Sequence, residues 1–157
     1  MCARRERPGT EERSEARAAN VSMSLFVVAG LGFLLPFVTL SCSGQPLSTL
    51  TGVQLAAGVG VGTYRSPADA RVAFALGMCV LGILLRFMGV GSARRISSAL
   101  AAAAGILALL SFKTSIDGDT LRQGHGVIRV QYEVGYYLVL SAFVGAAATA
   151  LWGPKVR

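Results

Sequence analysis

Long, predominantly apolar stretches alternate with polar segments along the chain. Four such stretches lie at residues 21–40, 70–90, 96–112 and 135–152. Each is close to the roughly 20 residues that an α-helix needs to cross about 30 Å of hydrocarbon. The pattern therefore predicts an all-α membrane protein, in which residues 21–153 form a bundle of four transmembrane helices.

The two longer connecting segments, residues 41–69 and 113–134, carry strand patterns. Apolar and polar side chains alternate over residues 126–134, as in a half-buried strand. Upstream, Asp117-Gly118-Asp119 predicts a hairpin turn, and residues 45–55 are rich in β-prone Thr, Leu and Val. Three strands with an apolar face can persist where a lone hairpin is marginal. We therefore expect both loops to form a small antiparallel β cap on the bundle.

Proline marks the ends of the first two helices. Pro36 lies near the outer end of the first, where we expect a local kink. Ser66 can cap the second helix, with Pro67 at its first position and Asp69 at its third. The second helix is therefore expected to begin directly after Ser66.

Small residues recur four apart in the last three helices, and residues four apart share a helical face. Since helices in lipid associate by close packing, these stripes predict helix–helix contacts. The stripes are Ala73 and Gly77; Ser97, Ala101 and Gly105; Ser141, Gly145 and Thr149; and Ala142, Ala146 and Ala150.

Composition agrees with a membrane location. The 157 residues are 53% hydrophobic and only 15% charged, with a mean hydropathy of +0.57. A soluble domain of this size could not hide so much apolar surface in one core. The net charge of +7 makes nucleic-acid binding an alternative to consider. However, the basic residues are dispersed over tails and loops without an aromatic platform, so we expect no nucleic-acid partner.

The distribution of basic residues predicts the orientation. Ten of the 15 Lys and Arg residues lie before the first helix, after the fourth, or at the short loop between helices two and three. By the positive-inside rule, the tail at residues 1–20 and the C-terminus at 154–157 are cytoplasmic. The tail is too polar to bury a core and is expected to be disordered or a frayed surface helix. Arg86 should extend its side chain to the inner interface.

Arginine, alanine and glycine are abundant, which indicates a GC-rich bacterial genome. We expect a multi-pass protein of the bacterial plasma (inner) membrane. Aromatic residues at both ends of the fourth helix, Tyr136, Tyr137 and Trp152, are typical of interfacial belts. The sequence leaves the translation start open between Met1 and Met23.

Motifs for chemistry are few. His125 is the sole histidine, and with Asp117 and Asp119 it could form a metal or catalytic site, but no nucleophile accompanies it and most calcium-loop positions are missing. The predicted spans hold no Asp, Glu, Lys or His for proton-coupled transport. We predict no catalytic, cofactor-binding or metal-binding residues.

The cysteines lie far apart and form no metal or dithiol motif; they are Cys2, Cys42 and Cys79. Cys79 is interpreted as an apolar filler of the second helix. Leu40-Ser41-Cys42 weakly matches a lipoprotein cleavage site, and whether Cys42 is modified stays open.

Residues 35–45 (LPFVTLSCSGQ) and 51–58 (TGVQLAAG) resemble a pattern in small bacterial four-helix membrane proteins of unassigned function. This resemblance covers about a quarter of the chain and implies no activity. The overall plan is also similar to that of the claudins, but the tryptophan and paired cysteines of a claudin first loop are absent. Junction-like sealing is therefore not implied.

These observations favour a non-enzymatic integral membrane protein. We expect an accessory or interaction component of the cell envelope that acts through its outer loops on an envelope protein or as a homo-oligomer. The alternative is a small oligomeric pore or permease, with a path lined by Ser97, Ser98, Ser141 and Thr149. A membrane enzyme using Asp117, Asp119 and His125 is a weaker third hypothesis.

Overall fold

The computed structural model describes residues 8–42, 45–58, 60–61, 64–65, 67–88, 92–123 and 128–151. This part of the chain is mostly helical, with five helices and a small three-stranded antiparallel sheet. The helices are α1 (Pro8–Gly32), α2 (Gly52–Ala57), α3 (Ala70–Met88), α4 (Ser92–Gln123) and α5 (Val134–Leu151). The three-stranded sheet holds β1 (Pro36–Cys42), β2 (Gln45–Thr51) and β5 (Ile128–Tyr132), and a separate two-stranded ribbon holds β3 (Gly60–Val61) and β4 (Tyr64–Arg65).

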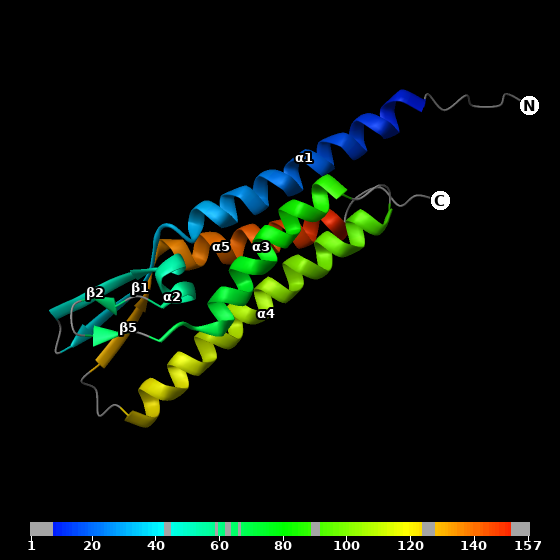
Figure 1. The fold of residues 1–157 in the computed structure, drawn as a ribbon. Helices are drawn as coiled ribbons and strands as arrows, with labels where there is room; N and C mark the ends of the chain where they lie inside the picture. Colours follow the sequence, from blue (N-terminus) through cyan, green and yellow to red (C-terminus); the bar gives the residue numbers. More distant parts are fainter. Residues whose placement is uncertain are drawn as a thin grey trace, which may run out of the picture.

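Helices α1, α3, α4 and α5 pack side by side as a bundle (Figure 1). α1 contacts α3 and α5, and α4 contacts the same two helices. The start of α1 and the end of α5 lie at one end of the bundle, and the three-stranded sheet lies at the other. The predicted combination of a helical bundle and a small antiparallel sheet is confirmed at this level.

Two buried phenylalanine rings in the core pack directly against glycines of neighbouring helices. Phe26 of α1 and Phe143 of α5 are fully buried and meet edge to face, with ring centroids 6.1 Å apart. A Cβ atom on Gly82 of α3 would lie 2.5 Å from Phe26, and one on Gly105 of α4 would lie 2.8 Å from Phe143. These glycines let neighbouring helices approach closely.

The predicted small-residue stripes pack in part. Ala101 and Gly105 of α4 and Ala142 and Ala146 of α5 are buried, so these contact faces are confirmed, whereas Ser141 of the second α5 stripe is exposed. Gly77 of α3 differs, because a Cβ atom there would have no neighbour within 4 Å. That part of the α3 stripe is open, and the expectation of a helix contact at Gly77 is wrong within this chain.

The first helix is shorter at its outer end than predicted. It ends at Gly32, and the segment from Pro36, expected to be helical to residue 40, is strand β1. Proline lacks the N–H that a helix interior needs, and it disfavours the helical conformation of the residue before it. Pro36 therefore begins a strand and does not kink a helix. α1 also begins at Pro8, within the tail that was expected to be disordered or only a frayed surface helix.

The helix α4 is longer than predicted. It continues to Gln123, so the predicted hairpin around Asp117-Gly118-Asp119 is wrong. We call residues 113–123 the α4 extension. Ile116 in this extension packs against the buried core, and tertiary contacts of this kind outweigh the cost of about 1 kcal/mol for a glycine inside a helix.

Helices α3 and α5 lie close to their predicted ranges of 70–90 and 135–152. The cap of α3 is Asp69, whose Oδ1 accepts the N–H groups of Arg71 at 2.8 Å and Val72 at 3.4 Å. The helix thus begins three residues later than the pattern around Ser66 indicated; Ser66 lies outside the described residues.

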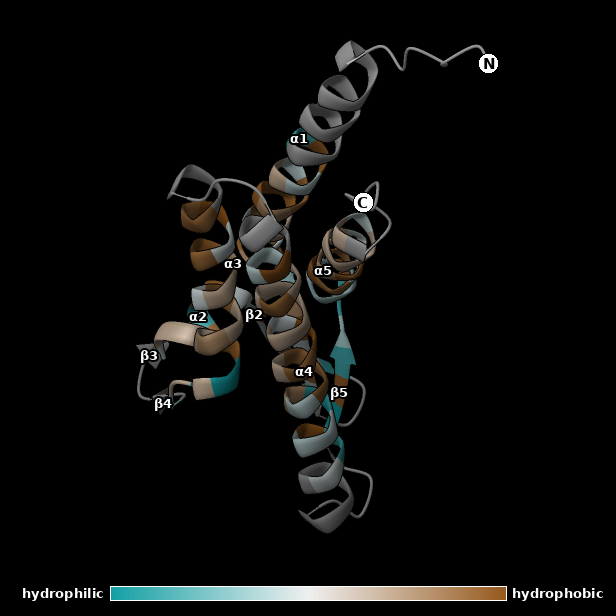
Figure 2. Cartoon of the chain, turned by 90° about the vertical axis from the view of Figure 1, so that its right-hand side faces the viewer, coloured by the Kyte–Doolittle hydropathy of each residue, from teal (hydrophilic) through white to brown (hydrophobic). Residues whose placement is uncertain are grey.

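Among the described helical segments, one is both long and apolar enough to cross a membrane by length and composition. It is Ile96–Gly118 of α4, with 23 residues. Shorter apolar stretches occupy α1, α3 and α5, at Asn20–Gly32, Ala70–Leu85 and Val134–Ala150. Figure 2 shows hydrophobic residues along the helices and hydrophilic ones on β5.

Candidate interaction surface

We use the term cap for β1, β2, β5, α2 and the α4 extension. β1 is the central strand and pairs antiparallel with both β2 and β5. The predicted strand at 126–134 is confirmed for residues 128–132 as β5, whereas Val134 begins α5. The predicted extended segment at 45–55 is β2 as far as Thr51, and residues 52–55 instead belong to α2. The central strand was not predicted, because it lies inside the stretch assigned to the first helix.

The register gives the sheet two chemically different faces. Val38 is opposite Leu50 and Tyr132, and these side chains are buried or partly buried. Thr39 is opposite Thr49 and Gln131 on the other side. Since paired residues share a face, one side of the sheet is apolar and the other polar. The polar face of the sheet is formed by Thr39, Ser41, Thr49, Arg129 and Gln131.

Thr49, Arg129 and Gln131 are exposed on the polar face. The hydroxyl oxygens of Thr39 and Thr49 lie 3.2 Å apart. Ser41 donates a hydrogen bond of 3.2 Å to the carbonyl oxygen of Arg129. The polar face of the three-stranded sheet therefore presents hydroxyl, amide and guanidinium groups.

Tyr132 joins β5 to the α4 extension. Its hydroxyl donates to Asp117 Oδ1 at 2.9 Å and lies 3.3 Å from the carbonyl oxygen of Lys113. The ammonium group of Lys113 lies 5.4 Å from the centre of the Tyr132 ring, a cation–π distance. Burial, the hydrogen bond to Asp117 and the charge of that carboxylate raise the pKa of Tyr132 above its ordinary value. The phenol therefore stays protonated and holds the extension against the sheet.

The short helix α2 is fixed at both ends. Thr51 and Gln54 form a capping box: Thr51 Oγ1 accepts the N–H of Gln54 at 3.3 Å, and Gln54 Oε1 accepts the N–H of Thr51 at 3.0 Å. Gly58 ends the helix with φ of +69°, and a Cβ atom there would lie 2.7 Å from the backbone of Ala68. Sequence reasoning missed this helix, although Thr-x-x-Gln is a readable capping-box signal.

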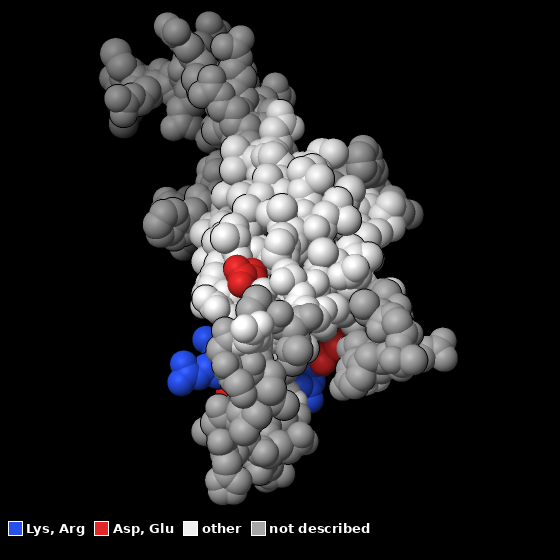
Figure 3. Space-filling model, turned by 90° about the vertical axis from the view of Figure 1, so that its left-hand side faces the viewer, with Lys and Arg blue, Asp and Glu red and all other residues white. Residues whose placement is uncertain are grey.

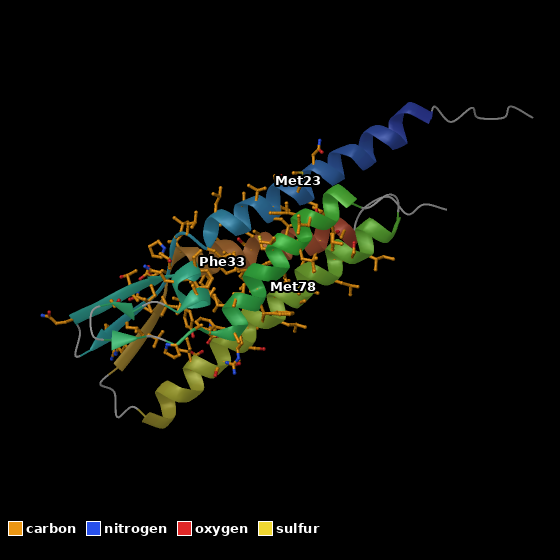
Figure 4. All side chains as sticks on the ribbon, in the orientation of Figure 1. Met23, Phe33 and Met78 are labelled. Atoms are coloured by element: carbon orange, nitrogen blue, oxygen red, sulfur yellow. The ribbon has the colours of Figure 1, made fainter. Side chains whose placement is uncertain are left out.

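α2 is held against the bundle by backbone hydrogen bonds. The N–H of Val53 donates to the carbonyl oxygen of Phe33 at 3.0 Å, and the N–H of Asp69 donates to the carbonyl oxygen of Leu55 at 2.9 Å. Phe33 is fully buried and lies where α1 meets the cap (Figure 4). Arg71 at the start of α3 donates to the carbonyl oxygen of Ser111 within α4 at 3.2 Å.

An apolar groove lies between α2 and α3, with a volume of about 600 Å³. Its residues are alanine, glycine, valine and leucine: Val53, Ala56, Ala57, Ala73, Leu76, Gly77, Val80, Leu81 and Leu84. The open space above Gly77 belongs to this groove.

Of the three candidate catalytic residues, Asp117 is the one whose side chain the structure describes. Asp117 lies on a helix and is engaged by Tyr132. His125 and the side chain of Asp119 lie outside the described residues. Across the described segments, no group of three His, Cys, Asp or Glu side chains could hold a metal ion.

Cys79 is buried, as expected of an apolar filler, and its thiol donates to the carbonyl of Phe26 at 3.0 Å. Cys42 ends β1, but its side chain lies outside the described residues, as does Trp152. Tyr136, predicted to lie at an interface, is almost fully buried, whereas Tyr137 is 54% exposed.

The hydroxyl residues proposed to line a pore lie in different environments. Ser98 is buried and Ser141 is exposed. Ser141 donates to the carbonyl of Leu138 at 2.9 Å, and Thr149 donates to that of Ala146 at 2.9 Å. These two hydroxyls therefore bond to carbonyl groups three residues earlier in the same helix.

Comparisons with protein-family models, curated protein sequences and solved structures gave no match to this chain. The two resemblances drawn from the sequence therefore stay predictions.

Proposed function

We propose that this chain is a multi-pass protein of the bacterial plasma membrane, in which the four long helices cross the bilayer and the cap lies outside. Within this proposal the protein is not an enzyme. It acts as an accessory component whose polar sheet face binds another component of the cell envelope.

The observation that carries the membrane location is a belt of exposed apolar side chains on all four long helices. We call it the apolar belt. It includes Val27, Val28 and Leu31 of α1; Phe74, Val80, Leu81 and Leu84 of α3; Leu100, Leu107 and Leu110 of α4; and Tyr137 and Val144 of α5. Soluble monomers rarely expose a contiguous apolar patch larger than a few hundred Å². Hydrocarbon around the helices would remove this penalty.

Charge supports the same interpretation. On the face shown in Figure 3, the described charged side chains lie in the half nearer the cap, and the rest of the described surface carries none. The sequence holds no charged residue between Arg95 and Lys113 of α4, a length of about 27 Å at 1.5 Å per residue. This length matches a bilayer core of about 30 Å.

The shorter apolar helices are compatible with this location. Ala70–Leu85 of α3 extends over about 24 Å and Val134–Ala150 of α5 over about 25 Å. Both helices are shorter than a hydrocarbon core of about 30 Å. The bilayer can thin around them, or flanking side chains can extend to the interface, and each ångström of mismatch costs less than about 1 kcal/mol. The apolar stretch of α1 is extended past the end of the helix at Gly32 by Phe33, Leu34 and Leu35.

The polar face of the sheet supports an interaction role for the cap. The exposed side chains of Thr49, Arg129 and Gln131 can exchange their hydrogen bonds with water for bonds to a partner. We favour this role over a pore because Ser98 is buried inside the bundle whereas Ser141 is exposed on its surface, so the candidate pore residues do not share one environment.

Extraction and cross-linking test the two parts separately. Membranes from cells that express the chain are washed with alkaline carbonate and then dissolved in mild detergent. We expect the chain to stay with the membranes until detergent is added. Release by carbonate alone would refute the membrane location.

A photoreactive amino acid in place of Gln131 then tests the cap. We expect one discrete cross-linked product in intact cells, and the substitution Arg129→Glu on the same face should weaken it. The matched control carries the photoreactive residue at Leu107 in the apolar belt. A product that is equally strong from Leu107, or unaffected by Arg129→Glu, would count against the polar face as the binding surface.

A further inference from the structure

We propose that Arg71 and its neighbours on α4 bind the phosphate group of an anionic phospholipid in the outer leaflet. The site lies where the start of α3 meets α4, beside the apolar belt. This inference rests on the proposed membrane location, and its test below fails differently from that proposal.

Arg71 carries a positive charge that the fold holds in place without neutralising it. Its Nη1 donates a hydrogen bond of 3.2 Å to the carbonyl oxygen of Ser111, 40 residues later in the chain. The side chain is exposed, and no carboxylate of the described segments forms an ion pair with it. Asp69 lies two residues earlier, but its Oδ1 accepts the backbone N–H groups of Arg71 and Val72. The guanidinium therefore keeps its charge and further N–H donors available for an anionic ligand.

Hydroxyl groups accompany the anchored guanidinium. Thr114 Oγ1 donates to the same carbonyl oxygen of Ser111 at 3.1 Å, so Arg71 and Thr114 meet at one acceptor. The side chain of Ser111 is itself exposed, and its hydroxyl can donate. Phosphate suits this set of groups, because charge-assisted hydrogen bonds from Arg to phosphate are short, strong and often bidentate.

Both helices place these groups at the edge of their apolar stretches. Arg71 is the second residue of the apolar stretch Ala70–Leu85 of α3. Ser111 lies two residues before Lys113, where the uncharged part of α4 ends. Headgroups border the hydrocarbon core of a bilayer, and a long Arg side chain near a helix end extends to that border. In the proposed orientation, the guanidinium therefore lies at the level of the outer-leaflet phosphates.

Apolar side chains beside the site favour a phospholipid over a soluble anion. Phe74 follows Arg71 by three residues on α3 and is 49% exposed. Leu107 precedes Ser111 by four residues on α4 and is 65% exposed. Residues three or four apart share a helical face. A phospholipid held by its phosphate can lay its acyl chains on this surface, whereas inorganic phosphate or an acidic segment of a soluble protein gains nothing from it.

Arg71→Gln tests this inference, because it removes the charge and keeps an amide that can donate to the Ser111 carbonyl. The full-length protein in mild detergent is titrated with phosphatidylglycerol, and bound lipid is counted by native mass spectrometry. We expect Arg71→Gln to bind this lipid about tenfold more weakly than the wild type, since hydrogen bonds to charged groups contribute at least that factor. Diacylglycerol with the same acyl chains lacks the phosphate and should bind to the wild type only weakly.

Lys113→Gln is the matched control, because it removes one positive charge at the same end of the apolar part of α4. The Lys113 ammonium lies over the Tyr132 ring and not beside Arg71. This variant should bind phosphatidylglycerol as tightly as the wild type. Excess inorganic phosphate should not displace the lipid from the wild type.

Equal affinity of Arg71→Gln and the wild type for phosphatidylglycerol, or equal losses in Arg71→Gln and Lys113→Gln, would overturn the phosphate site. Displacement by inorganic phosphate would overturn it in favour of a soluble anion. Diacylglycerol binding to the wild type as tightly as phosphatidylglycerol would overturn it without any variant. A wild-type protein that needs no detergent would instead refute the membrane location.

Discussion

Two glycines in the bundle lie directly under aromatic rings, and a third lies open. Gly82 and Gly105 leave no room for a methyl group beside Phe26 and Phe143, whereas Gly77 has space around it. The same residue type therefore has opposite roles at these positions. A stripe in the sequence cannot separate them, because the difference depends on which helix lies opposite.

The substitution Gly105→Ala should destabilise the bundle by about 1–3 kcal/mol, since its methyl group would overlap the buried Phe143 ring. Gly77→Ala is the control and should be neutral or stabilising by up to about 1 kcal/mol, because alanine is the better helix former. Thermal unfolding in detergent, followed by circular dichroism, measures both. Equal stability of the two variants would contradict the packing described here.

Tyr132 should make the fold sensitive to alkaline pH. Its pKa is raised in the folded state, so its contribution to stability is complete below its ordinary value of about 10 and is lost as the pH rises above that value. Tyr132→Phe keeps the ring and removes the ionisable hydroxyl. We expect this variant to be less stable than the wild type at pH 8 and to lose less of its stability between pH 8 and pH 11. Parallel losses in the two proteins would show that Tyr132 does not contribute.

At the scale of elements, α3 and α5 were predictable because apolar length and periodicity agreed with local helix signals. β1 was not. The uncharged run from residue 21 to 40 shows that the segment is apolar, but apolar length alone does not separate a buried strand from a helix. Pro36 was the signal for a strand here. A proline followed by the β-prone run Phe-Val-Thr favours the end of a helix over a kink within it.

The α4 extension was missed for the opposite reason. Asp-Gly is a strong local turn signal, and here it is overruled by long-range contacts of Ile116 and Asp117 with the core and the sheet. The polar face of the sheet was predictable in part, because alternation in β5 placed Arg129 and Gln131 together. Its Thr39 and Ser41 could not be found before β1 was recognised as a strand.

Gly118→Ala distinguishes the helix from the predicted hairpin. A Cβ atom at Gly118 meets nothing within 4 Å, and alanine stabilises a helix interior by about 1 kcal/mol relative to glycine. We expect slower amide hydrogen exchange across residues 113–118 in the variant. Faster exchange would indicate that Gly118 needs the positive φ of an Asp-Gly turn, as in the hairpin.

At the scale of the whole molecule, the fold separates two kinds of surface. The four long helices expose apolar side chains over their middle, and the polar groups of the sheet gather at the end away from the termini. The two ends of the bundle are therefore chemically different. In the proposed orientation, with the cap outside, Arg94 and Arg95 at the start of α4 lie at the cytoplasmic end, in agreement with the positive-inside rule.

The central claim is that the apolar belt is covered by lipid while the cap meets water outside the cell. Single cysteines placed at Thr49 in the cap and Leu107 in the belt, in a chain without its native cysteines, test it most directly, because both positions are exposed in the isolated chain. Intact cells are treated with a membrane-impermeant maleimide. We predict rapid labelling at position 49 and none at position 107, even after the cells are broken open without detergent. Labelling at position 107 as fast as at position 49 would contradict the account.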